Sequence, residues 1–280
     1  MKKLLILLLA LLINCNNKNK SMENSKDNFI YMLNYNTNVN FSIFINDFLI
    51  YENNNIQGSQ GGMIELNPFI PNSSTQNLKI ILKNENGNIP STELSKQNFQ
   101  LIRAKIPLEE NRFEEIDKAK FVFLPKQNII SIVEFKPILS YDSKEINLNQ
   151  SKDLSKIDKT ELSDKVLAFY ENYGEIINTG NTEAYKKLFK NAHDREIISM
   201  YYTPEEANKM IVKLSQRISE SKGGLQPLEN FTLYIHPNNK VVELRTKDGK
   251  SPLFSKLNGK IKRFGVFLHI PNNSDNVTIY

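Results

Sequence analysis

The sequence predicts two folded domains, an N-terminal all-β antiparallel sandwich over residues 29–141 and a C-terminal α+β domain over residues 160–280, with helices packed on an antiparallel sheet. Short runs of β-type alternation fill the first region, and turn residues separate them. After residue 160 the apolar spacing changes to three and four, which is the helical period. The polar stretch 142–159 between them is typical of a linker. A chain of 280 residues accommodates two modest domains.

The strands of the first domain are predicted from alternation and turn chemistry. Apolar and polar residues alternate from Val39 to Ile45, and Asn46-Asp47 marks a tight turn into a strand over 48–51. The other predicted strands are 63–66, 78–82, 99–106, 121–124 and 129–135. The Glu-rich stretch Pro107 to Lys118 is predicted as a short exposed helix or a charged loop. About seven strands without a clear intervening helix favour a sandwich.

This strand-turn-strand order resembles that of immunoglobulin-like or jelly-roll sandwich modules. The resemblance lies in residues 45–47, 64–70 and 77–80, where Asn and Pro interrupt apolar runs. Several modules of these folds bind carbohydrate, so the resemblance implies a glycan as one class of partner. Because Asn is favoured at turns in any case, the motif supports the fold more than the ligand.

The second domain is predicted to begin with helices and to end with strands. Apolar residues on one face predict a helix from Leu162 that stops near Gly180, and a second short helix is predicted over 182–189. Thr203-Pro204-Glu205-Glu206 has the residues of a capping box with Pro at the first helical position, so a third helix is predicted from there to about Gly223. Strands are predicted over 231–235, 241–246, 261–270 and 277–280, with a tight turn at Asn258-Gly259.

The N-terminus has the pattern of an export signal. Lys2 and Lys3 precede an apolar run from Leu4 to Ile13, which is too short to cross a bilayer as a helix. The run ends in Leu12-Ile13-Asn14-Cys15, which resembles the lipobox of bacterial lipoproteins, although Asn14 stands where Ala, Gly or Ser is usual. The resemblance implies cleavage after residue 14 and lipidation of Cys15. An ordinary signal peptidase site and an uncleaved anchor are the alternatives.

The single cysteine agrees with that interpretation. Cys15 is the only cysteine, so no internal disulfide is possible, and an exported thiol is protected if a lipid occupies it. Residues 15–28 are then the lipidated cysteine and a flexible tether. Asn16 is not the Asp of the known inner-membrane retention signal, so we expect lipid anchoring in the outer membrane, on a side that the sequence does not specify.

The order of helices followed by an antiparallel meander resembles the NTF2-like, or cystatin-like, fold. Proteins of that fold often hold a small molecule in a concavity, and some place an acid-base pair of Asp or Glu with His there. If the chain shares it, the polar and aromatic residues able to point into the concavity are Tyr170, Tyr173, Tyr201, Tyr202, Glu243, Arg245 and His269. The alternative is that the tyrosines are core residues and that Glu243 and Arg245 are solvated strand positions.

Several classes of chemistry are not indicated. The histidines His193, His236 and His269 are far apart in sequence, so no metal site is expected, and His236 is predicted to be exposed in a hairpin turn. No nucleophile elbow or phosphate-binding loop is present, so neither a catalytic residue nor a cofactor is assigned. The net charge of +5 is spread along the chain, which argues against a nucleic-acid partner.

These observations lead to two hypotheses of function. The first is a non-catalytic, lipid-anchored envelope protein that binds a protein or a glycan, and an immunity-type inhibitor of a toxin is one version of it. The second is an NTF2-like enzyme or carrier of a small ligand, with His269 as acid or base. A pocket on which Glu243, Arg245 and His269 converge would favour the second hypothesis.

Overall fold

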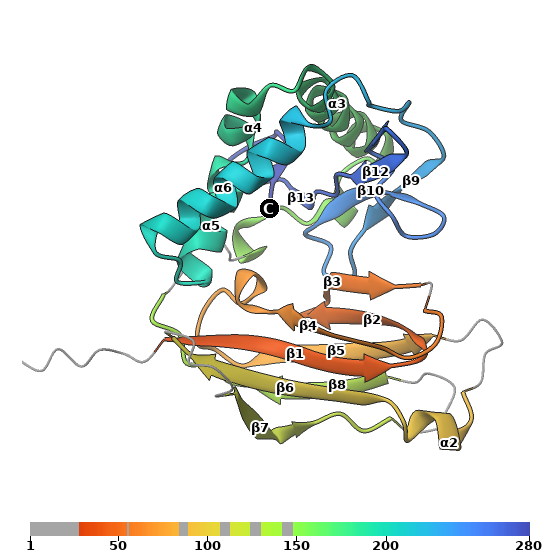
Figure 1. The fold of residues 1–280 in the computed structure, drawn as a ribbon, viewed down its shortest axis with the longest axis vertical. Helices are drawn as coiled ribbons and strands as arrows, with labels where there is room; N and C mark the ends of the chain where they lie inside the picture. The colour runs from red at the N-terminus through yellow and green to blue at the C-terminus, as the bar shows by residue number, and fades with distance from the viewer. Residues whose placement is uncertain (1–27, 55, 84–88, 107–112, 124–129, 142–147) are drawn as a thin grey trace, which may run out of the picture.

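The computed structural model describes residues 28–54, 56–83, 89–106, 113–123, 130–141 and 148–280. Its N-terminal region consists of antiparallel sheets, and its C-terminal half combines helices with strands (Figure 1). The described chain therefore has the two-part, α+β composition that the sequence predicts. The predicted signal peptide, Cys15 and most of the tether lie outside the described residues.

Two four-stranded sheets form the sandwich-like N-terminal region. The strand order of the first sheet is β4 (Gln60–Glu65), β1 (Phe29–Thr37), β6 (Asn98–Lys105) and β7 (Phe113–Lys120). The strand order of the second is β3 (Phe48–Asn53), β2 (Asn40–Ile45), β5 (Gln76–Lys83) and β8 (Ile130–Phe135). Neighbouring strands in both sheets run antiparallel. A short helix, α2 (Ser91–Leu94), precedes β6.

Alternation of side chains builds the core between these sheets. Every second residue of β5 is buried, because successive side chains of a strand point to opposite faces, whereas β2 is buried on both faces from Phe41 to Ile45. The inward residues of these two strands are Phe41, Ile43, Ile45, Leu78, Ile80 and Leu82. The positive φ angles of Asn46 and Asp47, 49° and 62°, close the β2–β3 hairpin, as the sequence predicts.

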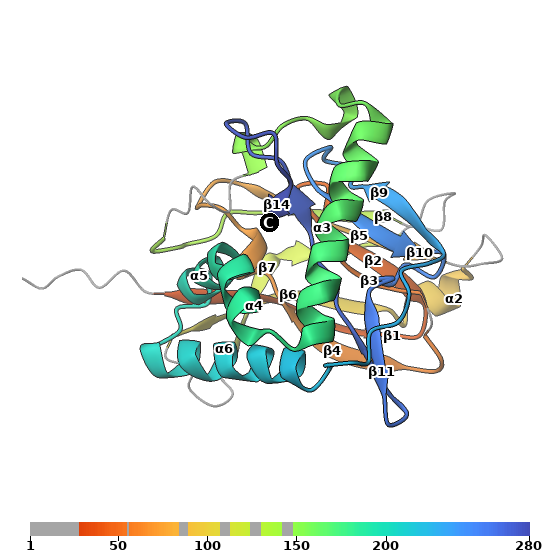
Figure 2. The ribbon, with the colours of Figure 1, turned by 90° about the horizontal axis from the view of Figure 1, so that it is seen from above.

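The C-terminal half places helices around a second antiparallel sheet. Its helices are α3 (Lys159–Thr179), α4 (Thr182–Leu188), α5 (Lys190–Ser199) and α6 (Pro204–Ser219). Its four-stranded sheet has the order β14 (Thr278–Ile279), β13 (Leu268–His269), β10 (Val242–Thr246) and β9 (Phe231–Ile235). A separate hairpin pairs β11 (Phe254–Leu257) with β12 (Lys260–Arg263). Seen from above, β14 lies between α3 and α5 (Figure 2).

Capping residues explain where the helices begin and end. Asp158 accepts hydrogen bonds from the first turn of α3, and Gly180 ends that helix with a left-handed φ of 69°. Thr203 and Glu206 form the predicted capping box of α6. One face of α3 is buried against the sheet, including Tyr170. The predicted helices over 162–180, 182–189 and from Pro204 are confirmed.

The two halves share a buried junction. Phe48 of β3 is almost fully buried, and its ring centroid lies 4.9–5.2 Å from those of His236, Phe267 and Tyr280 in the C-terminal half. Asn67 lies in the 3₁₀ turn η1 (Asn67–Phe69) and donates to the carbonyl of Ser199 at the end of α5. Strand β3 and turn η1 therefore belong to the sandwich and also support the C-terminal half.

Some predicted elements differ in the structure. Residues 113–118 were predicted as part of a helix or loop, but they belong to β7, which pairs with β6. The predicted strand 121–124 is irregular at 121–123, and the predicted strand 261–270 is divided into β12 and β13. Strand β1 and helix α5 were not predicted as elements of their own. In the predicted linker, residues 142–147 lie outside the described residues, whereas Leu154 is fully buried in the C-terminal core.

Candidate functional site

A cavity of about 450 Å³ lies inside the C-terminal half, between its helices and its strands. Helices α3 to α6 form one side, and strands β10, β12 and β14 with the segment 264–267 form the other. Pro68 and Phe69 of η1 reach it from the sandwich. Of the lining residues, Arg217 and Gly265 are exposed, so they mark the opening. The volume lies within the range of about 300–1,000 Å³ that is usual for small-molecule sites.

Seven of the residues that line the cavity are Phe or Tyr. Tyr173 of α3 lies 5.0 Å from Phe189, between ring centroids, and Phe189 lies 4.7 Å from Tyr185. The helical spacing of Tyr185 and Phe189 puts both rings on one face of the chain. The aromatic residues that line the cavity are Phe69, Tyr173, Tyr185, Phe189, Phe264, Phe267 and Tyr280. Such a wall suits an apolar, ring-containing molecule.

Helix α5 contributes buried polar groups to the same wall. Arg195 is 8% exposed, and its guanidinium carbon lies 4.3 Å above the ring of Tyr280. His193 lies with its Nε2 3.2 Å from the hydroxyl of Tyr185, and burial lowers the pKa of this histidine. Burial also raises the pKa of Glu196 above its usual value. The cavity thus contains ionisable groups that are partly shielded from water.

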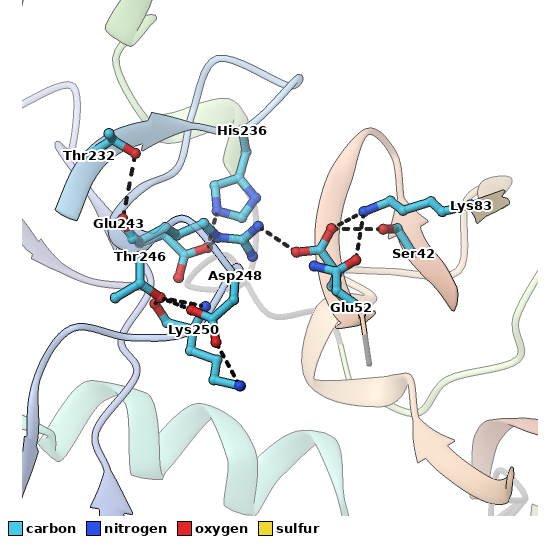
Figure 3. A network of polar contacts seen from close by, with 11 residues as sticks. Ser42, Glu52, Lys83, Thr232, His236, Glu243, Thr246, Asp248 and Lys250 are labelled. Carbon is cyan, nitrogen blue, oxygen red and sulfur yellow. Dashed lines mark hydrogen bonds and ion pairs between the residues drawn. The ribbon is translucent and has the colours of Figure 1, made fainter. Parts of the chain in front are cut away.

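Glu243 is the polar residue that β10 contributes to the cavity wall, and it is 6% exposed. Its Oε1 accepts hydrogen bonds from Arg245 Nε at 2.7 Å and from His236 Nε2 at 3.0 Å. Arg245 also pairs with Glu52 of the sandwich, and Glu52 in turn pairs with Lys83 (Figure 3). Acidic and basic groups therefore alternate from the cavity wall into the sandwich.

This network corrects the prediction for His236. The turn around Pro237 suggested an exposed histidine, but the side chain is fully buried and bonded to Glu243. Burial lowers its pKa, although the Glu243 carboxylate opposes that effect. No local motif indicates this burial, because the rings that cover His236 come from Phe48 and Phe267, which belong to other segments of the chain.

The structure separates most of the predicted pocket residues. Only Tyr173 and Glu243 line the cavity. Tyr170 is buried beneath it, where its hydroxyl accepts from the backbone N–H of Leu244. Arg245 points toward Glu52 of the sandwich. The remaining three predicted residues lie elsewhere: they are Tyr201, Tyr202 and His269.

Tyr201 and Tyr202 pack near the outer face of the first sandwich sheet. They belong to a cluster with Ile30 and Met200, at the end of α5. Burial raises the pKa of both tyrosines. Their role in the structure is thus to connect the helical layer with the sandwich.

His269 lines a second hollow of about 460 Å³, which Thr278 and Ile279 of β14 also line. Its Nδ1 lies 2.7 Å from Ser151 Oγ, and burial together with the positive charge of Arg195 lowers its pKa to about 4. Arg195 and Ile279 line both hollows. His269 is therefore neutral near pH 7 and lies outside the aromatic cavity.

Sequence reasoning missed the residues of α5 that line the cavity. The helix carries few apolar residues, so no helical stripe marked it, and Arg195 and His193 had no motif to distinguish them. Among the described residues, no group of three or more His, Cys, Asp or Glu side chains could hold a metal ion. Within the same residues, none of the helices combines the length and apolar character that a membrane span requires.

The comparisons with known proteins add no relative. No protein-family model matches the chain, and neither the curated proteins nor the solved structures contain a significant match. The functional argument therefore depends on the geometry of the aromatic cavity and on the N-terminal motif.

Proposed function

We propose that this chain is a non-catalytic, lipid-anchored envelope protein that binds a small, mainly apolar molecule in its aromatic cavity. The observation that carries the proposal is a cavity of about 450 Å³ with seven aromatic residues in its wall. A hollow of this size that opens to the surface and has an apolar wall is typical of sites that hold a small molecule. The anchor in the outer membrane, through Cys15, is proposed from the leader and the lipobox.

The arrangement of the C-terminal half supports the NTF2-like hypothesis. A long first helix, shorter helices and an antiparallel sheet surround one hollow, which is where proteins of that fold hold their ligands. The open side between α6 and Gly265 would admit the molecule.

Binding is favoured over catalysis by the positions of the candidate acid-base groups. His269 lines the second hollow and is hydrogen-bonded to Ser151, and His236 is hydrogen-bonded to Glu243. Arg245 is directed to Glu52. Glu243, Arg245 and His269 do not converge on one pocket, so the arrangement expected of an NTF2-like enzyme that uses His269 is not formed.

The proposal is tested with 2-naphthol as a probe, on protein that lacks residues 1–27. Every contact described above lies within residues 28–280, so this protein retains them all. Ala192 lines the cavity, and Ala168 is an exposed alanine of α3 that does not. We expect 2-naphthol to raise the melting temperature of the wild-type and Ala168→Phe proteins but not of Ala192→Phe. An equal rise in all three would place the probe outside the cavity and reject the proposal.

A second candidate function is the binding of a partner protein through the sandwich. Val122, Ile130 and Ile132 are 62%, 37% and 59% exposed, and Val122 is held beside β8 by a hydrogen bond from its N–H to Ser131. None of the large exposed hydrophobic side chains of the described residues is aromatic, which favours a protein over a glycan as the partner. If the partner is a toxin, this chain would be an immunity-type inhibitor.

That candidate is tested by pull-down from envelope extracts with wild-type protein and Ile132→Glu. We expect a specific partner to be lost with Ile132→Glu and retained with Val212→Glu, which removes an equally exposed residue on α6. Recovery of the same proteins with both variants would reject the β8 surface as the binding site.

A further inference from the structure

One oxygen of Glu243 is unused. Both hydrogen bonds to this carboxylate, from Arg245 and from His236, end on Oε1. Within the part of the chain that the structure describes, Oε2 accepts no hydrogen bond, although the side chain is more than nine-tenths buried and lines the cavity. Because the side chain is so little exposed, a hydrogen bond from a bound molecule to Oε2 would be shielded from bulk water. The wall therefore presents an acceptor that a bound molecule can satisfy with a hydroxyl or N–H group.

The opening of the cavity is positively charged. Arg217 is exposed there, with its guanidinium carbon 5.1 Å from the ring centroid of Phe264, and Arg263 also lines the cavity, with its guanidinium carbon 4.9 Å from the ring centroid of Phe254. Arg217 donates to the backbone carbonyl of Arg263, and Arg263 donates to that of Ser251. Neither forms an ion pair with a described carboxylate. Their positive charges are thus available to a ligand.

The acidic groups of the cavity do not cancel this charge. Glu243 already has Arg245 as a partner, and the positive charge of Arg195 acts on Glu196, whose pKa is raised by burial. Arg195 adds a third arginine to the wall. The lining therefore holds three arginines and two glutamates, and an anionic ligand would gain charge-assisted hydrogen bonds from the arginines.

We propose that the ligand is an anionic amphiphile with a ring-containing body and a hydrogen-bond donor at its far end. Its anionic group lies at the opening on Arg217 and Arg263, its body contacts the aromatic wall, and its donor meets Glu243 Oε2. The inference rests on the proposed function, since it assigns the chemistry of the molecule that the cavity would hold.

Three naphthalenes of nearly equal size test the anionic group and the hydrogen-bond donor of the ligand separately. 6-Hydroxy-2-naphthoate carries both the anion and the donor, 2-naphthoate lacks the donor, and 2-naphthol lacks the anion. Titration calorimetry on protein lacking residues 1–27 gives the affinity of each. We expect 6-hydroxy-2-naphthoate to bind about tenfold more tightly than either of the others, as charged hydrogen bonds allow.

Two variants test whether Arg217 and Glu243 contact the ligand. Arg217→Gln should lower the affinity for 2-naphthoate about tenfold and leave that for 2-naphthol unchanged. Lys213→Gln is the matched control, since Lys213 is an exposed cation of the same helix that does not line the cavity. Glu243→Gln should remove the advantage of 6-hydroxy-2-naphthoate over 2-naphthoate, and 2-naphthoate itself reports whether the cavity of that variant is intact.

The outcomes distinguish this inference from the proposed function. If 2-naphthol binds as tightly as the two carboxylates, or if Arg217→Gln and Lys213→Gln behave alike, the anionic assignment is wrong while the cavity remains a binding site. If Glu243→Gln leaves the advantage of 6-hydroxy-2-naphthoate intact, the donor assignment is wrong. If none of the three compounds binds, both the inference and the proposed function fail.

Discussion

Arg245 of β10 and Glu52 of β3 form an ion pair between the two halves of the molecule, with Nη1 3.0 Å from Oε2. Both side chains are 12% exposed. Lys83 forms an ion pair with the other oxygen of Glu52, and Arg245 Nε donates a hydrogen bond to the carboxylate of Glu243. Removing one member leaves its neighbour as a buried charge with too few partners, which costs more than the loss of an exposed ion pair.

Glu52→Gln should therefore lower the free energy of unfolding by about 3 kcal/mol. The matched control is Glu161→Gln, which breaks the exposed pair with Lys165 on α3 and should change the stability little. Urea denaturation followed by circular dichroism measures both variants. Equal stabilities of the two variants would show that the junction pair contributes no more than a surface pair.

The buried histidines predict a loss of stability in acid. Burial holds the pKa of His269 at about 4, below the value near 6.5 of an unfolded chain, and lowers those of His193 and His236 as well. As the pH falls through 6.5, the unfolded chain takes up protons that the folded protein does not bind. The free energy of unfolding should therefore decrease as the pH falls, and His269 contributes to that decrease between about 6.5 and about 4.

His269→Gln tests this effect, with urea denaturation at pH 7 and pH 5. The variant should lose less stability between the two pH values than the wild type does. Ser151→Ala removes the hydrogen bond to His269 without removing the titrating group, so its stability should decrease at both pH values and keep the wild-type slope. A wild-type slope in His269→Gln would show that this histidine does not contribute.

Local chemistry explains which elements could be predicted. The Asn46-Asp47 hairpin and the Thr203 capping box depend on neighbouring residues, and both are present in the structure. Strand β7 has Glu and Lys where strands usually carry apolar residues, and it is defined by pairing with β6. Such pairing is a property of the whole sheet, so residues 113–118 did not indicate a strand.

The candidate site was less predictable than the fold. Alternation places Glu243 on a face of β10, but it does not show that His236 and Arg245 share one of its oxygens. Arg195 lies on a helix without an apolar stripe. His269 was predicted to point into the concavity, but it lines a different hollow. Contacts between distant segments decide each of these positions.

The lipid anchor is tested at Cys15. We expect the native protein to partition into the detergent phase of a Triton X-114 separation, and Cys15→Ser to abolish this partitioning once the leader is cleaved. Asn14→Ala, which introduces a residue that is usual before the lipobox cysteine, should remain lipidated. Mass spectrometry of the mature N-terminus gives the acyl mass. An unmodified thiol on native protein would reject the anchor.

Asn67 should be the most sensitive polar residue of the junction. It is fully buried, its Oδ1 accepts from the N–H of Tyr31 at 2.7 Å, and its Nδ2 donates to the carbonyls of Phe29 and Ser199 at 2.9 Å each. Asn67→Ala leaves these three backbone groups without their partner, so we expect a loss of about 2–4 kcal/mol in the free energy of unfolding. Asn77→Ala, at an exposed position of β5, is the control and should change it little.

Asn67→Ala should also weaken ligand binding in the cavity. Ser199 is the last residue of α5, the helix that carries His193 and Arg195, so loss of its bond to Asn67 loosens one wall. Asn67→Ala should weaken 2-naphthol binding at a temperature where the variant is still folded, whereas Asn77→Ala should not. Calorimetry at 10 °C makes the comparison. Unchanged affinity in a destabilised Asn67→Ala protein would mean that the sandwich stabilises the fold without shaping the cavity.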